Sequence, residues 1–437
     1  MHTLKALPKI GLLVAGLAIA LEGSAQPQLP GAIEGSWEGV VDYQGEPLSL
    51  RVYADGDRGL RVDYPQLVFT DQEVGVSHQD GKTLLSLPML GDFPVQVGEQ
   101  AISGARTLES GTVISIQLTP AAGFHKRTED LAFGTDGSVA GTLTLPPGQG
   151  PFPLTILLAG AGNPNRGNVS YRSWADHLAR IGVASLAYDR RPDNEYAADG
   201  FLYDLDDHVA DVVSAMDLLE QHPLIDREQI YLHAKSRGGW IALETAARDP
   251  RIAAIVGIGI VAGSMPMQDL QAVQDRMRRD GRDANEIDAA LAYTRLYFET
   301  AENPALWPSL RSAAKEAGAA AWAEYVRIPE QPGDLEWFSA HLDTDVTDLV
   351  PGIQAPMFLA WGSEDAIAPA SMNLPMFHWL LSEESAEQSR LKVYAGASHT
   401  LEGPLNVDDD PETVWAGMNP QFLAEVTAWI EGLSASE

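Results

Sequence analysis

The pattern of apolar residues changes near residue 128, and this change limits the fold more than any other feature. Residues 35–120 contain short segments of alternating apolar and polar residues, separated by turn signals such as Asp55-Gly56-Asp57. Alternation with a period of two is typical of strands with one buried face, so this part predicts a small all-β barrel or sandwich. After Thr128, apolar strands alternate with helical patterns, which predicts a mostly parallel sheet covered by helices.

These patterns predict two domains, an all-β domain over residues 26–125 and an α/β domain over residues 126–437. The α/β pattern is interrupted at about 264–349, where Ala, Leu, Glu and Arg recur with helical periodicity. This segment is therefore predicted to be an inserted helical cap. Four aromatic residues of the cap either line a substrate pocket or fill the helix core, and the sequence leaves both open. They are Trp307, Trp322, Trp337 and Phe338.

Residues 1–25 have the pattern of an export signal. Lys5 and Lys9 precede an apolar run from Ile10 to Leu21, and small residues follow as far as Ala25. The run is shorter than the roughly 20 residues that a membrane-spanning helix needs. We therefore expect cleavage near Ala25, no membrane span, and a periplasmic or extracellular location.

Charge and composition exclude several function classes. The 437 residues include 29 Lys and Arg against 61 Asp and Glu, a net charge of −32, which repels nucleic acid. The absence of cysteine excludes disulfides, thiol catalysis and cysteine-ligated metals. His78 and His125 lack neighbours at metal-ligand spacing, and we expect no metal and no organic cofactor. No pattern predicts an oligomeric state.

The segment Ala234-Lys235-Ser236-Arg237-Gly238 lies between a predicted strand and a predicted helix. Small residues two positions before and after a serine are typical of a nucleophile elbow, a sharp turn that exposes the serine. The alternative is an ordinary strand-to-helix connection in which Ser236 caps the helix.

Two later loops, each after an apolar strand, offer partners for this serine. Asp365 is preferred to its neighbour Glu364 because an apolar residue and then Pro369 follow, as expected for an acid turned inward. His399 follows the next strand, whereas His378 lies within a predicted helix and is expected to pack there. In this arrangement His399 would accept the proton of Ser236, and Asp365 would orient the imidazole.

An ester or amide carbonyl under attack also needs donors for its oxyanion. The sequence offers the backbone N–H of Arg237 and those of Gly160 and Ala161, in a glycine-rich turn after a predicted strand. A phosphate-binding loop is the alternative for that turn, but the Gly-Lys-Ser/Thr ending is missing.

Together these motifs resemble the α/β-hydrolase superfamily, in the group of dienelactone-hydrolase-like and serine-aminopeptidase-like esterases. The resemblance covers residues 128–437. It is carried by residues 158–162, Asp189-Arg190-Arg191, the Ser236 elbow, residues 361–365 and residues 396–399. Residues 31–120 resemble the β-rich module that precedes many exported bacterial hydrolases.

The resemblance implies a serine hydrolase that cleaves small carboxylic esters through an acyl-enzyme. A peptidase or amidase with the same triad is the alternative, and a non-catalytic binding protein is a third possibility. The chain departs from its relatives at Ala234, where glycine is usual, at Lys235, where histidine is usual, and at Arg237, where glutamate is common. The differences at Lys235 and Arg237 change the charge beside the serine and leave the substrate preference open.

Overall fold

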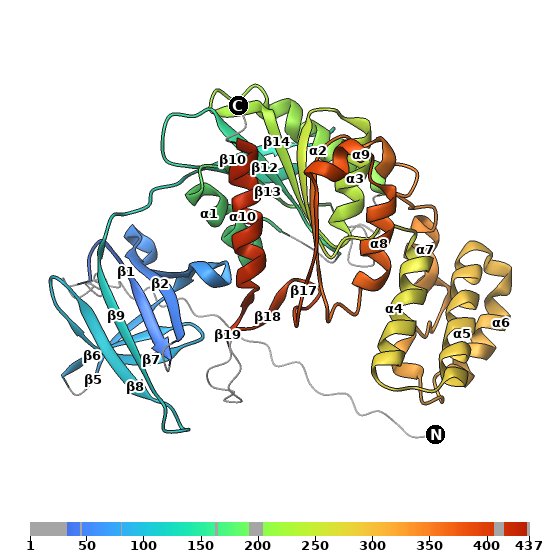
Figure 1. Ribbon diagram of the computed structural model, residues 1–437, viewed down its shortest axis with the longest axis horizontal. Helices are drawn as coiled ribbons and strands as arrows, with labels where there is room; N and C mark the ends of the chain where they lie inside the picture. Colours follow the sequence, from blue (N-terminus) through green and yellow to red (C-terminus); the bar gives the residue numbers. More distant parts are fainter. Residues whose placement is uncertain are drawn as a thin grey trace, which may run out of the picture.

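The computed structural model describes residues 33–43, 46–79, 81–161, 165–191, 204–405 and 415–434. The predicted signal peptide, residues 1–25, lies outside these ranges. Two large sheets follow one another along the chain, and the predicted cap projects from the second (Figure 1). Within the described ranges, every helix is too short or too polar to cross a membrane.

The first sheet is antiparallel throughout and has the order β4-β3-β2-β1-β9-β8-β7-β6-β5. Its strands are β1 (Ser36–Tyr43), β2 (Glu46–Ala54), β3 (Leu60–Tyr64), β4 (Phe69–Glu73), β5 (Gly75–Gln79), β6 (Lys82–Leu87), β7 (Gly91–Val97), β8 (Ile102–Thr107) and β9 (Val113–Ala121). Along β9, Ile114, Ile116 and Leu118 are buried, whereas Val113 is exposed, which is the expected alternation. The edge strands β4 and β5 are not paired with each other, so the predicted small all-β domain has the form of an open half-barrel.

The second sheet has the order β10-β11-β13-β12-β14-β15-β16-β17. Its strands are β10 (Arg127–Phe133), β11 (Val139–Leu145), β12 (Phe152–Leu158), β13 (Ala184–Tyr188), β14 (Ile225–Lys235), β15 (Ile252–Ile258), β16 (Met357–Gly362) and β17 (Arg390–Tyr394). Strand β11 is antiparallel to both of its neighbours, β10 and β13. The strands β13, β12, β14, β15, β16 and β17 run parallel to one another. The predicted mostly parallel sheet is confirmed.

Helices cover both faces of this sheet (Figure 1). They are α1 (Val169–Arg180), α2 (Leu205–Leu219), α3 (Gly238–Arg248), α8 (Ala370–Leu380), α9 (Glu383–Gln388) and α10 (Pro420–Ser434). Alternate residues of β14 face opposite cores: Leu232 packs with α2, α3 and α8, whereas Tyr231 packs with α1 and α10. Strands buried on both faces must be apolar throughout, which explains the apolar runs in the sequence.

The cap and a hairpin complete the chain. The cap contains α4 (Met265–Arg279), α5 (Ala284–Glu302), α6 (Trp307–Ala317) and α7 (Glu336–His341), inserted between β15 and β16. The hairpin of β18 (Glu402–Leu405) and β19 (Trp415–Met418) precedes α10. The half-barrel and the cap lie at opposite ends of the molecule (Figure 1).

The half-barrel is attached to the α/β domain through α1. Val68 joins the core beneath α1 and α10. The backbone N–H of Thr70 donates to Ser173 Oγ on α1 at 3.1 Å, and Arg172 pairs with Asp71 at 2.9 Å. The contact is therefore partly apolar and partly ionic.

Candidate active site

Ser236 lies in the turn between β14 and α3, with a backbone φ of +52°. Non-glycine residues rarely adopt this left-handed region, and the strain is typical of functional sites. The turn is tight because α3 begins against the end of β12: a Cβ atom on Gly238 would lie 2.5 Å from the carbonyl oxygen of Leu158. Only glycine fits there, and the turn has the geometry of a nucleophile elbow.

Asp365 and His399 form a hydrogen-bonded pair. His399 Nδ1 lies 2.8 Å from Asp365 Oδ2, and the other carboxylate oxygen accepts from the backbone N–H groups of Ile367 and Ala368, each at 2.8 Å. Asp365 is 1% exposed. The side chain of Glu364 is 55% exposed and faces Arg279. The carboxylate turned toward His399 is thus the one chosen from the sequence.

Ser236 and His399 both lie at the carboxyl end of β15. The N–H of Ser236 donates to the carbonyl of Ile258 at 2.8 Å. The next residue, Gly259, lies under the His399 ring, since a Cβ atom on it would approach the ring atoms to 2.8 Å. Ser236 Oγ makes no hydrogen bond to His399 in the described structure. Catalytic hydrogen bonds often form fully only when substrate binds.

Gly160 lies after β12 and faces the elbow, since a Cβ atom on it would lie 3.4 Å from Ser236 Cβ, and Ala161 follows it in the chain. The rest of the turn, from Gly162, lies outside the described residues. Arg190 is buried, and its Nη2 donates to the carbonyl of Gly160 at 2.8 Å. Its neighbour Asp189 accepts from the backbone N–H of Arg166 at 2.7 Å and pairs with the guanidinium of that residue.

Asp189 and Arg190 therefore bind the chain on both sides of the glycine-rich turn, at Arg166 and at Gly160. The sequence motif alone does not predict this positioning role. A signal existed, because charged residues directly after β13 must lie beside the carboxyl end of the neighbouring strand β12.

Arg237 links the elbow to the cap. Its guanidinium is buried and lies 4.9 Å from the centre of the Trp337 ring, and Nη2 donates to His341 Nε2 at 2.9 Å. The His341 Nδ1–H group donates to the carbonyl of Trp337 at 2.7 Å. The first turn of α7 and its last residue thus contact the residue that follows Ser236.

Two of the other cap aromatics pack within the cap. Trp322 contacts Tyr293, and Phe338 contacts Tyr297. Of the four aromatic residues singled out in the sequence, Trp337 is the one with a contact to a candidate site residue. The packing role expected for His378 is wrong, because that side chain is exposed on α8.

The described residues contain no group of three or more His, Asp or Glu side chains that could hold a metal ion. The groups that do meet are a strained serine, a histidine paired with a buried carboxylate, and backbone amides at the start of α3. This set can activate a hydroxyl nucleophile and stabilise developing negative charge.

The chain is similar in sequence to known proteins. A model of the protein family described as serine aminopeptidase, S33, matches residues 167–404. A non-heme chloroperoxidase of Streptomyces lividans is 25% identical over 249 residues, which are 56% of this chain and 82% of that protein.

Two similar solved structures are a 2,6-dihydroxy-pseudo-oxynicotine hydrolase and a thermophilic esterase from Thermogutta terrifontis. The first has a TM-score of 0.46 at 17% identity and covers 71% of this chain and 68% of its own. The second has a TM-score of 0.41 at 16% identity and covers 70% of this chain and 99% of its own.

Proposed function

The chain belongs to the serine aminopeptidase S33 family of α/β-hydrolases, and we propose that it is a carboxylesterase with Ser236, His399 and Asp365 as its catalytic triad. The observation that carries this proposal is the buried Asp365–His399 pair, whose ring lies at the end of β15 beside the Ser236 elbow. The proposed substrates are small carboxylic esters.

In the proposed reaction, Ser236 Oγ attacks the ester carbonyl while His399 Nε2 accepts its proton. Asp365 holds the proton on Nδ1 and stabilises the imidazolium that forms. The N–H groups of Arg237, Gly160 and Ala161 donate to the oxyanion. His399 then protonates the leaving alcohol, and the same steps with water release the acid and restore Ser236.

The charge beside the nucleophile supports an ester over the aminopeptidase alternative. An aminopeptidase must bind the positively charged amino terminus of a peptide close to the scissile bond. Arg237 places a buried guanidinium next to Ser236, and Lys235 precedes it. Two cations at this point repel an ammonium group and favour a neutral or anionic substrate.

We also propose that the chain is exported to the periplasm or the cell exterior. This proposal depends on the pattern of residues 1–25 alone. Cleavage near Ala25 is tested by amino-terminal sequencing of the protein recovered from a secreting host.

The first test is labelling with a fluorophosphonate probe, followed by turnover of p-nitrophenyl esters of increasing acyl length and of aminoacyl p-nitroanilides. We expect Ser236→Ala to abolish labelling and to lower ester turnover by about 10³-fold or more. The matched control is Ser110→Ala, in an exposed turn of the half-barrel, which should label and turn over normally.

Wild-type protein that is folded but neither labels nor cleaves any ester would contradict the proposal. Cleavage of the anilides in preference to esters would support the aminopeptidase alternative.

A further inference from the structure

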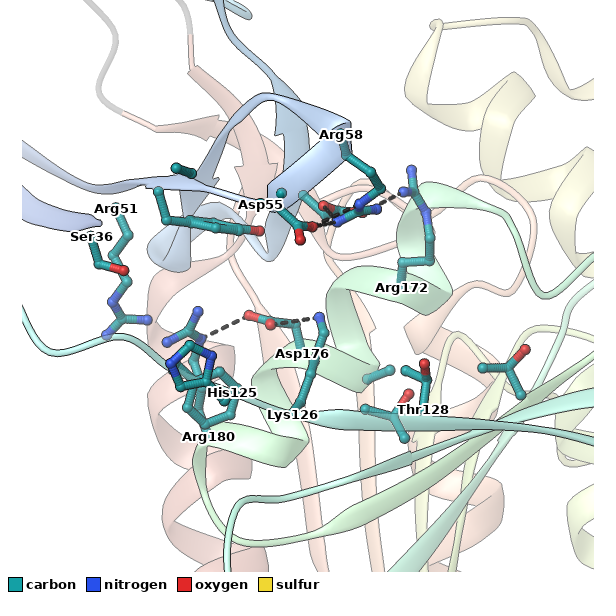
Figure 2. A pocket seen from close by; sticks show the side chains of 18 of the residues that line it. Ser36, Arg51, Asp55, Arg58, His125, Lys126, Thr128, Arg172, Asp176 and Arg180 are labelled. Atoms are coloured by element: carbon teal, nitrogen blue, oxygen red, sulfur yellow. Dashed lines mark hydrogen bonds and ion pairs between the residues drawn. The ribbon is translucent and has the colours of Figure 1, made fainter. Parts of the chain in front are cut away.

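A cleft of about 840 Å³ lies between the half-barrel and α1, and both domains line it (Figure 2). None of Ser236, Asp365 and His399 is among its lining residues. The cleft is therefore separate from the candidate active site, and nothing in the proposed hydrolysis uses it.

The lining is rich in cations although the chain is strongly acidic. The chain has 29 Lys and Arg against 61 Asp and Glu, yet cations outnumber carboxylates in the cleft, where four carboxylates face six basic side chains. The basic residues are Arg51, Arg58, Lys126, Arg166, Arg172 and Arg180. The cleft therefore has an excess of positive charge, whereas the chain as a whole has an excess of negative charge.

The carboxylates of the cleft are already held. Asp176 accepts from Lys126 and Arg180, each at 2.8 Å, and its side chain is 3% exposed. Burial alone would raise the pKa of Asp71, but ion pairs with Arg58 and Arg172 contribute to lowering it. These acids are fixed as anions, and each guanidinium has five N–H donors, more than these pairs use.

Some of the remaining donors are buried without an acceptor. Arg51 uses Nε to pair with Glu38 at 2.7 Å, but its Nη1 is buried and has no hydrogen-bond partner in the described structure. The Nε of Arg172 is also buried without a hydrogen-bond partner in the described structure. Figure 2 shows Arg51 and Arg180 pointing toward each other beside His125, although like charges repel. An anion between Arg51 and Arg180 would accept from Arg51 and relieve this repulsion.

The size and the other lining residues define the ligand further. A volume of about 840 Å³ exceeds what one inorganic anion fills and is within the usual range for an organic ligand. Thr128, Thr142 and Thr144 offer hydroxyls, and Trp37 and Tyr53 offer aromatic surface. Hydroxyls, aromatic rings and guanidinium groups together suit a sugar that carries acidic groups.

We propose that this interdomain cleft binds an anionic carbohydrate through its carboxylate or phosphate groups. Arg51 and Lys126 bind the oxyanions directly, and the threonines bind sugar hydroxyls. Because the cleft joins the two domains, the bound sugar also stabilises their contact.

The test is calorimetric titration of the full chain at constant ionic strength with three probes. Trigalacturonate carries carboxylates, fructose 1,6-bisphosphate carries phosphates, and cellotriose is neutral. We expect one of the anionic probes to bind and to raise the melting temperature, and the neutral probe not to bind. Whichever anion binds identifies the source of the oxyanion.

Two variants connect the binding to the cleft. Arg51→Gln and Lys126→Gln should each weaken the affinity by about tenfold or more. The matched control, Arg295→Gln on the exposed face of α5, should bind as the wild type does. Turnover of p-nitrophenyl esters should be the same in Arg51→Gln as in the wild type, which shows that the variant is folded and separates this inference from the proposed esterase function.

Absence of binding by both anionic probes would overturn the proposal. Equal affinity in the wild type, Arg51→Gln and Arg295→Gln would do the same, because it would place the anion elsewhere.

Discussion

At the scale of single residues, the candidate site depends on Asp365, because both of its carboxylate oxygens have hydrogen-bond donors. Asp365 receives two backbone N–H groups on one oxygen and the His399 ring on the other. This fixes the tautomer of His399, because Nδ1 must carry the proton and Nε2 remains free to accept one. The strain at Ser236 and the burial of Asp365 are both costs to folding that an enzyme tolerates at its site.

Asp365→Asn tests this assignment. The amide oxygen of asparagine can keep the two backbone donors, so its NH₂ group would face His399 Nδ1. Nδ1 must then accept, the ring proton moves to Nε2, and His399 can no longer take the proton of Ser236. We expect kcat for p-nitrophenyl esters to fall by about 10⁴-fold with little change in melting temperature.

Glu364→Gln is the neighbouring control, because that side chain is largely exposed. It should retain nearly full activity. If the two variants exchanged these effects, Glu364 would be the triad carboxylate.

At the scale of secondary structure, the spacing of apolar residues predicts strands and helices wherever one face of the element packs into a core. The sequence predicts strands at residues 36–43, 60–64 and 184–188, and the structure has strands with these bounds, Ser36–Tyr43, Leu60–Tyr64 and Ala184–Tyr188. The predicted cap segment contains helices, and the described structure places no strand between β15 and β16.

The spacing of apolar residues does not predict a strand that lacks a regular alternation and is held in place by its neighbours in the sheet. The strand β8 has a polar sequence, Ile-Ser-Gly-Ala-Arg-Thr, and pairs because its Gly104 allows β7 to approach closely. The strand β4 contains Asp71 at a φ of +58°. This residue interrupts the alternation, so the sequence pattern does not predict the strand. The curvature of the half-barrel and the contact of Arg237 with the cap depend on packing between residues far apart in the sequence. Local sequence patterns do not predict such contacts.

The turn after β12 illustrates an element positioned by a distant side chain. Arg190 holds the carbonyl of Gly160, and lysine lacks the planar fork needed to keep that geometry in a buried site. We expect Arg190→Lys to lower kcat by about 10- to 100-fold while KM changes little, since the oxyanion donors would be misplaced in the transition state. Steady-state kinetics with one p-nitrophenyl ester measures both constants.

Fluorophosphonate labelling should persist in Arg190→Lys, although more slowly, because Ser236 and His399 are untouched while the oxyanion donors are displaced. A KM effect without a kcat effect would instead place Arg190 in substrate binding and contradict the positioning role.

At the scale of the whole molecule, ion pairs are a major part of the contact between the domains. Three buried acids of this contact are Asp63, Asp71 and Asp176. Arg180 on α1 pairs with Asp63 on β3 at 2.7 Å, and the N–H of Asp71 donates to the same Asp63 side chain at 2.8 Å. Burial and the nearby Asp176 carboxylate raise the pKa of Asp63. The contact is consequently sensitive to pH, and its acids respond in opposite directions.

Asp71→Asn isolates one of these responses. Asparagine tolerates the left-handed backbone at this position, so the substitution removes charge without new strain. Because burial is outweighed by the ion pairs with Arg58, Arg61 and Arg172, the folded pKa of Asp71 lies below its unfolded value of about 3.9. Its stabilisation is therefore present above about pH 4 and is lost as the pH falls through the folded pKa.

We expect the variant to lower the free energy of unfolding by about 2 kcal/mol at pH 7, and the difference from the wild type to shrink steadily below pH 4. Urea unfolding at pH 7, 5 and 3 measures this, with Glu73→Gln on the exposed side of β4 as the control that should change little. At low pH a protonated Asp71 and an asparagine are nearly equivalent. A difference that stayed constant from pH 7 to pH 3 would therefore show that Asp71 acts through packing and not through its charge.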